Sequence, residues 1–232
     1  MKLAIHQPNF LPWPGYYLKI HQADAMVHLD TAQHVRNDFD HRNWVKDPSG
    51  EKQWLRVHLA GSNPSIQPVN KVRLAGDNWR RNLENVLYNN YHRAPHYQPY
   101  ADRLLAIIHR EWPSLADLCL ALTESILKEL AITTPCSRLS EYDQKLGRRT
   151  ERLVNICRQL GADTYLSGIG GRTYLDEDLF RQAGINVEYQ DYRPVKYPQI
   201  HGPFVPNLSI VDLLFNTGPQ ARDYLLGGNV VQ

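Results

Sequence analysis

The sequence predicts an α/β fold of three layers around a mainly parallel sheet. The first observation is that short apolar stretches alternate with helical patterns near both ends of the chain. Two of these patterns have the order strand, helix, strand, which requires parallel pairing because a crossover helix must return the chain to the same edge. The second observation is a long helical stretch from about residue 79 to residue 130, which we interpret as an insertion. The whole chain, residues 1–232, is expected to form a single domain.

The first strand, helix, strand unit occupies about 30 residues. Apolar stretches at residues 3–5 and 25–29 are the expected strands, and a helix is expected over residues 15–22. Three prolines lie between the first strand and the helix, so that connection is a stiff loop. A hairpin should follow, because residues 47–50 read Asp-Pro-Ser-Gly between two Trp-containing stretches.

The middle and second half of the chain continue the pattern. Leu and Ile recur every three or four residues over residues 115–130, which indicates one buried helix face. A helix over residues 150–160, a strand at 164–166, a helix over 174–183 and a strand at 185–189 then form the second unit. The proline-rich residues 194–206 should be extended, without a strand partner.

Composition excludes several classes of protein. Hydrophobic residues make up 42% and charged residues 22%, the balance of a globular chain. The 26 Lys and Arg exceed the 24 Asp and Glu by two, so nucleic acid is not an expected partner. No apolar run approaches the ~20 residues that cross a bilayer, and no membrane span is expected. Three scattered cysteines and an N-terminus that is polar by His6 indicate a cytoplasmic location.

A glycine-rich loop joins the strand at 164–166 to the next helix. It reads Ser167-Gly168-Ile169-Gly170-Gly171-Arg172, and free amide groups at this kind of turn attract an anion. Arg172 adds a forked donor for a phosphate or carboxylate. The loop matches neither GxGxxG nor a P-loop, so a plain tight turn is an equally good reading.

Two other polar loops should open at the same edge of the sheet. Residues 7–16 combine prolines, aromatic rings and the amide of Gln7, which is typical of a preformed pocket wall, although a rigid loop that buries its own rings fits as well. The second loop follows the strand at 25–29. In it Asp30 is placed to act as a base or to orient an amine, and Arg42 to clamp an anion.

A metal site is the minority interpretation of the ten histidines. His28, His34 and His41 are spaced by six and seven residues, with Asp38 and Asp40 between the last two. No HxH or HExxH pair is present, so we expect no metal.

The residues also resemble a known family, the WbqC-like proteins. The matching motifs are Ile5-His6-Gln7-Pro8-Asn9-Phe10-Leu11-Pro12-Trp13-Pro14-Gly15-Tyr16, Arg42-Asn43, Tyr165-Leu166-Ser167-Gly168 with Tyr174-Leu175, Tyr197-Pro198-Gln199 and residues 204–216. Two positions depart from the family pattern: a Trp is missing before Arg42, and His6 stands where a less polar residue is usual. The resemblance carries over to the polar positions Gln7, Tyr16, Asp30, Arg42, Asn43, Ser167, Tyr174, Gln199, Ser209 and Asp212.

The resemblance implies a transferase in bacterial O-antigen, other glycoconjugate or specialised-metabolite biosynthesis. It would attach an acyl or aminoacyl group, such as glycyl, to an amino sugar or other small amine. The implied donor is a thioester on an acyl or peptidyl carrier protein, so a phosphopantetheine-linked donor takes the place of a cofactor, and the sequence itself requires none.

Roles can be assigned on that basis. Asp30 and Ser167 are the expected catalytic residues, as base and as oxyanion stabiliser. The expected substrate-binding residues are Gln7, Tyr16, Arg42, Asn43, Gly168, Arg172, Tyr174 and Gln199. The layout also resembles that of nucleotidylyltransferases, but residues 12–16 lack both histidines of the HxGH signature. A nucleotide-dependent enzyme and a non-catalytic module for a small ligand or carrier protein are therefore the alternatives.

Overall fold

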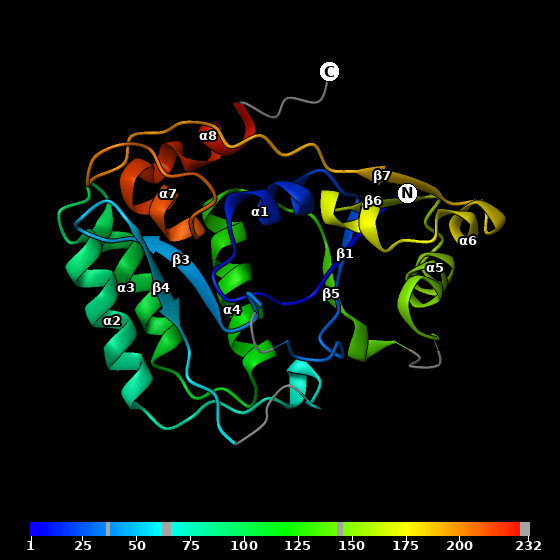
Figure 1. Ribbon diagram of the computed structural model, residues 1–232, viewed down its shortest axis with the longest axis horizontal. Helices are drawn as coiled ribbons and strands as arrows, with labels where there is room; N and C mark the ends of the chain where they lie inside the picture. The colour runs from blue at the N-terminus through cyan, green and yellow to red at the C-terminus, as the bar shows by residue number, and fades with distance from the viewer. Residues whose placement is uncertain (36–37, 62–65, 143–145, 228–232) are drawn as a thin grey trace.

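The centre of the fold is a five-stranded sheet in which every pairing is parallel (Figure 1). The computed structural model describes residues 1–35, 38–61, 66–142 and 146–227. The sheet has the order β5-β2-β1-β6-β7, with β1 (Lys2–His6), β2 (Ala25–His28), β5 (Cys136–Arg138), β6 (Thr164–Ser167) and β7 (Asn186–Tyr189). With helices on both faces, the predicted three-layer α/β fold is confirmed.

The remaining elements are helices and one separate hairpin. The hairpin joins β3 (Arg42–Lys46) to β4 (Lys52–Arg56) in antiparallel pairing, where the turn residues predict it. The helices are α1 (Pro14–His21), α2 (Asn78–Tyr91), α3 (Tyr97–Ile108), α4 (Leu115–Glu129), α5 (Arg149–Gln159), α6 (Glu177–Gln182), α7 (Ile210–Thr217) and α8 (Ala221–Gly227). Among the described helices, none combines the length and the apolar composition needed to cross a membrane.

The two faces of the sheet bury different cores because successive side chains of a strand point to opposite sides. On one face Ala4 and Met26 pack with α1, the helices α2 to α4, the hairpin and α7. On the other face Leu3 and Val27 pack with α5 and α6. The first core is much the larger, since the long helical stretch in the middle of the chain adds to it (Figure 1).

The order of the strands fixes where a ligand can bind. From β1 the chain moves through α1 to β2 on one side, and from β6 it moves through α6 to β7 on the other side. The neighbours β1 and β6 thus flank the point at which the winding reverses, and α/β sheets bind ligands outside the carboxyl ends of the strands at such a point. Pairing between β1 and β6 ends at Ala4 and Leu166, so the two strand ends beyond these residues are unpaired with each other.

Two elements differ from the expectations. The helix expected over residues 174–183 begins only at Glu177, because the Asp176 side chain accepts hydrogen bonds from the amides of Asp178 and Leu179 and caps α6 there. Residues 169–173 form a separate 3₁₀ helix, η4. The edge strand β5 was not predicted, since its three residues Cys-Ser-Arg carry no apolar pattern.

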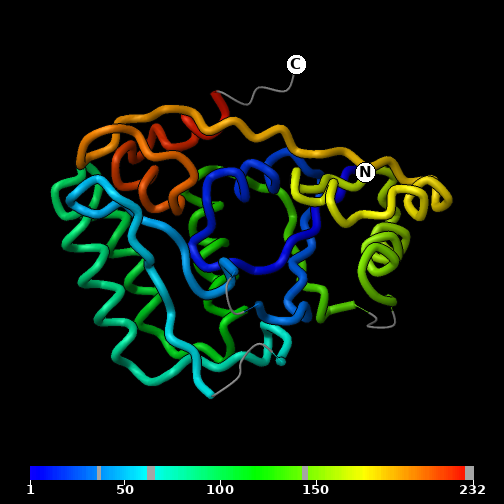
Figure 2. The backbone as a smooth tube through the Cα atoms, viewed as in Figure 1, coloured from blue at the N-terminus to red at the C-terminus, as the bar shows by residue number. Residues whose placement is uncertain are grey.

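An extended segment links β7 to α7. Residues 190–208, called the strap here, contain no helix or strand and run the length of the molecule (Figure 2). The far part of the strap is anchored on the buried Asp212 of α7, whose carboxylate accepts from Tyr197 Oη and Gln199 Nε2, both at 2.8 Å. Lys46 Nζ adds a hydrogen bond to the Pro203 carbonyl at 2.6 Å. The near part of the strap is held at the carboxyl edge of the sheet by Gln190, whose backbone N–H donates to the Ser167 carbonyl and whose Nε2 donates to the Gly15 carbonyl, both at 2.8 Å.

Candidate functional site

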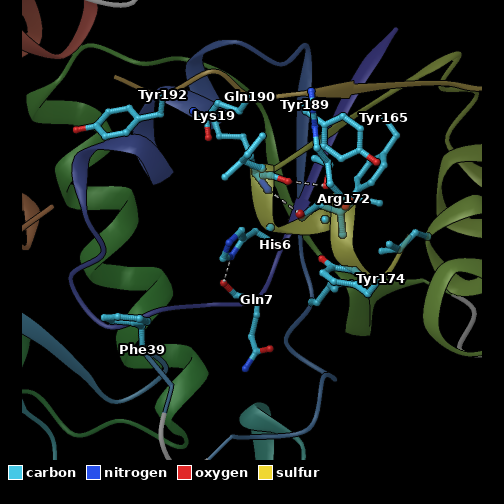
Figure 3. A pocket seen from close by; sticks show the side chains of 18 of the residues that line it. His6, Gln7, Lys19, Phe39, Tyr165, Arg172, Tyr174, Tyr189, Gln190 and Tyr192 are labelled. Atoms are coloured by element: carbon cyan, nitrogen blue, oxygen red, sulfur yellow. Dashed lines mark hydrogen bonds between the residues drawn. The ribbon is translucent and has the colours of Figure 1, made fainter. Parts of the chain in front are cut away.

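A cavity of about 1210 Å³ opens at the reversal point of the sheet (Figure 3). Its walls come from the ends of β1 and β6, from η4, from the first turn of α5 and from the start of the strap. This is larger than the 300–1,000 Å³ typical of sites for one small ligand. The cavity therefore has room for two reacting molecules.

The expected site residues divide into two groups. Six of them line the cavity: Gln7, Asn43, Ser167, Gly168, Arg172 and Tyr174. The other four, Tyr16, Asp30, Arg42 and Gln199, do not line it. The loops that follow β1 and β6 therefore meet at the cavity, whereas Asp30, at the start of the polar segment after β2, lies outside its lining.

The carboxylate of Asp30 forms hydrogen bonds within the protein. It is buried and accepts from the Ser140 amide at 2.9 Å and from Ser140 Oγ at 2.5 Å. These bonds hold the start of a short 3₁₀ helix, Leu139–Glu141, that follows β5. Both carboxylate oxygens are thus taken by a residue that lies outside the cavity lining.

The other three residues outside the lining have neighbours of their own. Tyr16 is buried, and its hydroxyl lies 3.1 Å from His28 Nδ1. The Arg42 guanidinium lies over the Trp54 ring, 4.1 Å from its centre. Gln199 belongs to the strap anchor described above. Tyr16 contacts the cavity wall indirectly, because its ring packs edge to face against the ring of His6, a residue that lines the cavity.

Asn43 shapes one wall of the cavity. Its buried side-chain amide donates to the carbonyls of Phe10 and Leu11 at 3.3 and 3.0 Å. Leu11 has a φ of 42°, a strained value for a residue with a branched side chain. Ser209 Oγ also donates to the Leu11 carbonyl, at 2.7 Å. Two side chains from distant parts of the chain thus hold the proline-rich loop in its strained conformation.

Replacing Asn43 with alanine should lower the free energy of unfolding by about 2 kcal/mol, because two buried carbonyls lose a donor. Asn43→Asp is the matched variant. It keeps the acceptor for the Trp44 amide but places a carboxylate against the same carbonyls, so it should destabilise at least as much. Urea unfolding of both variants measures this, and an Asn43→Asp protein as stable as the wild type would contradict the assigned role.

His6 ends β1 and presents one nitrogen to the cavity. Its Nδ1 lies 2.9 Å from the Gln7 carbonyl, and because a carbonyl can only accept, Nδ1 carries the proton. Burial, with a smaller contribution from the charge of Lys19, lowers the pKa of His6 to about 3. The ring is therefore neutral near pH 7, and Nε2 is a hydrogen-bond acceptor for a ligand N–H or O–H.

Lys19 lies beside His6 and was not expected from the sequence. It projects from α1, is 2% exposed, lines the cavity and donates to the Ile5 carbonyl at 3.0 Å. Burial lowers the pKa of Lys19 to about 7. Figure 3 shows His6 and Lys19 between Tyr192 on one side and Arg172 and Tyr174 on the other.

Basic and aromatic side chains make up much of the wall. The charged lining residues are Lys19, Arg149, Arg152, Arg172 and Asp191, and Asp191 is paired with Arg193 at 2.8 Å. Arg149 has a φ of 50°, so backbone strain marks this wall as well as the loop. The aromatic lining residues are Trp13, Phe39, Tyr165, Tyr174, Tyr189 and Tyr192. The wall thus suits a ligand with an anionic group and apolar or flat parts.

The glycine loop is tightly packed around Ser167. A methyl group added to Gly171 would lie 2.1 Å from Ser167 Oγ, so only glycine permits this approach. Ser167 Oγ donates to the Gly168 carbonyl at 3.1 Å. Ser167 is itself buried, and Gly168 to Arg172 carry the surface of the loop into the cavity.

The histidines considered for a metal pair with other groups instead. His34 Nδ1 lies 2.8 Å from the buried Asp40 carboxylate, which also accepts from Gln7 Nε2 at 2.6 Å. Over the described ranges, no three His, Cys, Asp or Glu side chains gather as a metal site would require. Asp40 thereby positions Gln7 at the floor of the cavity.

Several lining residues were not predicted from the sequence, although two of them, Lys19 and His6, stand out in it. Every residue of α1 from Pro14 to Ile20 is buried, and a lysine within so apolar a helix needs a reason. His6 departs from the family pattern at the carboxyl end of a strand. Arg149, Arg152 and Tyr192 left no such signal, because only the fold brings them to β1.

The chain was compared with known proteins. A family model described as the WbqC-like protein family matches residues 7–224. Rv1507c, an uncharacterized protein of Mycobacterium tuberculosis (strain ATCC 25618 / H37Rv), is 35% identical over 226 residues, or 97% of each chain. No solved structure matches. With a family match and a relative that both extend over nearly all of its length, the chain belongs to the WbqC-like protein family.

Proposed function

We propose that this protein transfers an acyl or aminoacyl group from a thioester donor to the amine of a small molecule such as an amino sugar. The observation that carries the proposal is a large cavity that combines His6 and Lys19 at one end with a wall of three arginines. The resemblance of its motifs to the family supports the same reaction and a place in bacterial glycoconjugate or specialised-metabolite biosynthesis. Free cysteines fit a cytoplasmic location.

The basic wall of the cavity suits the donor. A phosphopantetheine thioester or a nucleotide-linked substrate carries phosphate groups, which arginine binds with forked hydrogen bonds. Arg172 lies with its guanidinium 4.8 Å from the centre of the Tyr189 ring, which keeps it extended along the cavity wall. Tyr174, Trp13 and Tyr192 offer ring faces to the rest of the ligand.

The base end suits the acceptor. Nucleophilic attack requires the neutral amine, which must then lose a proton as the new amide bond forms. His6 Nε2 accepts a hydrogen bond from the amine and orients its lone pair toward the donor carbonyl. The thioester C–S bond breaks, and the departing thiolate takes up the proton that the amine nitrogen loses. The Ser167 hydroxyl, once it turns away from the Gly168 carbonyl, and the amides beyond it are the proposed contacts for the oxyanion. Asp30 instead holds the 3₁₀ helix that follows β5.

The test is product formation with a defined donor. Purified protein is incubated with glycyl-phosphopantetheine or glycyl-pantetheine thioester and an amino sugar nucleotide, and the amide is detected by mass spectrometry. Wild type should use the phosphorylated donor at least tenfold better in kcat/KM, and Arg172→Gln should abolish that preference. Arg181→Gln is the matched control, because Arg181 is exposed on α6 and pairs with Asp178.

Each other result favours a different function. Magnesium-dependent attachment of a nucleotide, with no amide formed, would replace the proposal with nucleotidylyl transfer. Binding of these ligands without turnover of any would indicate a non-catalytic module.

A further inference from the structure

Lys19 is a buried lysine without a carboxylate partner. In the described parts of the chain, the lysine ion pairs are Lys2 with Glu188 and Lys128 with Glu124. Within the described residues, Lys19 Nζ has a hydrogen bond to the Ile5 carbonyl at 3.0 Å and no carboxylate partner, although the side chain is 2% exposed. A buried ammonium without a counter-ion is costly, so its presence on the cavity wall calls for an explanation.

The titratable groups that interact with Lys19 in the described structure are uncharged near pH 7. The charge of Lys19 acts on His6 of β1 and His28 of β2, and burial is the main cause that lowers the pKa of each to about 3. The carboxylate of the cavity wall, Asp191, pairs with Arg193 at 2.8 Å. Tyr16, on the same helix, is buried and has its pKa raised. Nothing among these neighbours favours the ammonium form, and burial lowers the pKa of Lys19 to about 7. Near neutral pH a large fraction of Lys19 is a free amine.

The position of Lys19 is set by the fold. α1 follows the proline-rich loop directly. Its Lys19 side chain reaches back to the carbonyl of Ile5, the first residue of β1 beyond the pairing with β6. The side chain therefore enters the cavity at the reversal point of the sheet, next to His6. A proton acceptor placed there faces the same space as the acceptor-orienting Nε2 of His6.

We propose that Lys19 Nζ is the proton acceptor of the transfer reaction, an inference that rests on the proposed function. The substrate amine nitrogen forms a bond to the thioester carbonyl carbon, and the C–S bond breaks. The proton released by that nitrogen moves to the neutral Nζ. The Lys19 ammonium then returns this proton to the thiolate, which leaves as a thiol and restores the free amine.

A purely structural role for Lys19 makes the opposite stability prediction. If Lys19 served only to satisfy the Ile5 carbonyl, its removal would lower Tm. If Lys19 is a catalytic residue whose burial destabilises the fold, Lys19→Met should have a Tm equal to or above that of wild type at pH 7. The Tm difference between Lys19→Met and wild type should shrink from pH 7 to pH 10. In that range the lysine keeps its proton in the unfolded wild type but loses it in the folded protein, so the stability of wild type rises with pH.

The first experiment needs no substrate. Wild-type protein is labelled with trace acetic anhydride from pH 5 to pH 10, and peptides are quantified by mass spectrometry, with the exposed Lys128 reporting on a surface amine. The rate at Lys19 should rise to half its plateau near pH 7. A midpoint above pH 9, or no labelling of Lys19 by pH 10, would overturn the proposal.

The second experiment uses the transfer assay. Lys19→Gln keeps an N–H donor for Ile5 but cannot take a proton, and it should lose at least 100-fold in kcat with KM within threefold of wild type. The pH profile of wild type should rise through about pH 7, and the variant should lose this dependence. Lys128→Gln is the control. A kcat for Lys19→Gln within threefold of wild type would refute the role of Lys19 and leave the transfer function standing. If wild type itself gives no product, the transfer function fails, and the labelling result still decides whether Lys19 is a reachable free amine.

Discussion

Replacing Asp212 with alanine is expected to lower the free energy of unfolding by about 4 kcal/mol. Its buried carboxylate accepts from Tyr91 Oη at 2.7 Å as well as from Tyr197 and Gln199 of the strap. Removing it leaves three donors without their acceptor, and each such buried group costs about 1–3 kcal/mol. It also removes a negative charge that acts on the Lys46 ammonium. Urea unfolding at pH 7 measures the change.

Asp212→Asn separates the hydrogen bonds from the volume of the side chain. Asparagine retains one carbonyl acceptor, so it should lose about half as much stability as alanine. Asp223→Ala, on the exposed face of α8, should change stability by less than about 0.5 kcal/mol. An Asp212→Ala protein within about 1 kcal/mol of wild type would show that the strap is held by other contacts.

Most of the sheet could be predicted from the sequence because the patterns that specify these strands lie within short stretches of the chain. Each strand of the two predicted units is a short apolar stretch next to a helical pattern, and parallel pairing follows from the crossover helices. The edge strand β5 has no such pattern, and only its pairing with β2 makes it a strand. The helix start at Asp176 is likewise decided by a side chain that caps the backbone rather than by periodicity.

Apart from Asn43, which the family resemblance supplied, the site was predictable where a loop follows a strand at the reversal point. Gln7 and the glycine loop met that condition and line the cavity. Asp30 also follows a strand, but Ser140, distant in the chain, takes its carboxylate. A polar residue at a strand end gives the same sequence signal whether it meets a ligand or another part of the protein. Arg149 and Arg152 show the converse, since their place in the wall depends on the crossing of α5.

Acidification from pH 7 to pH 5 should destabilise the protein by about 2 kcal/mol through His28. Burial, aided by the charges of Arg138 and Lys19, lowers the pKa of His28 to about 3 in the folded state, whereas an unfolded histidine titrates near 6.5. Between these values the unfolded chain binds a proton that the folded chain excludes, so stability is lost as pH falls. One and a half pH units below 6.5 correspond to about 2 kcal/mol. His6 adds a loss of the same sign.

The slope of stability against pH isolates this effect from the contacts of the ring. His28→Gln loses the hydrogen-bond partner of Tyr16 and should be less stable at pH 7, but its stability should fall less between pH 7 and pH 5 than that of wild type. His109→Gln, exposed on the surface, is the control that should keep the wild-type slope. Urea unfolding at pH 7, 6 and 5 gives all three slopes, and an unchanged slope in His28→Gln would mean that the folded protein accepts this proton.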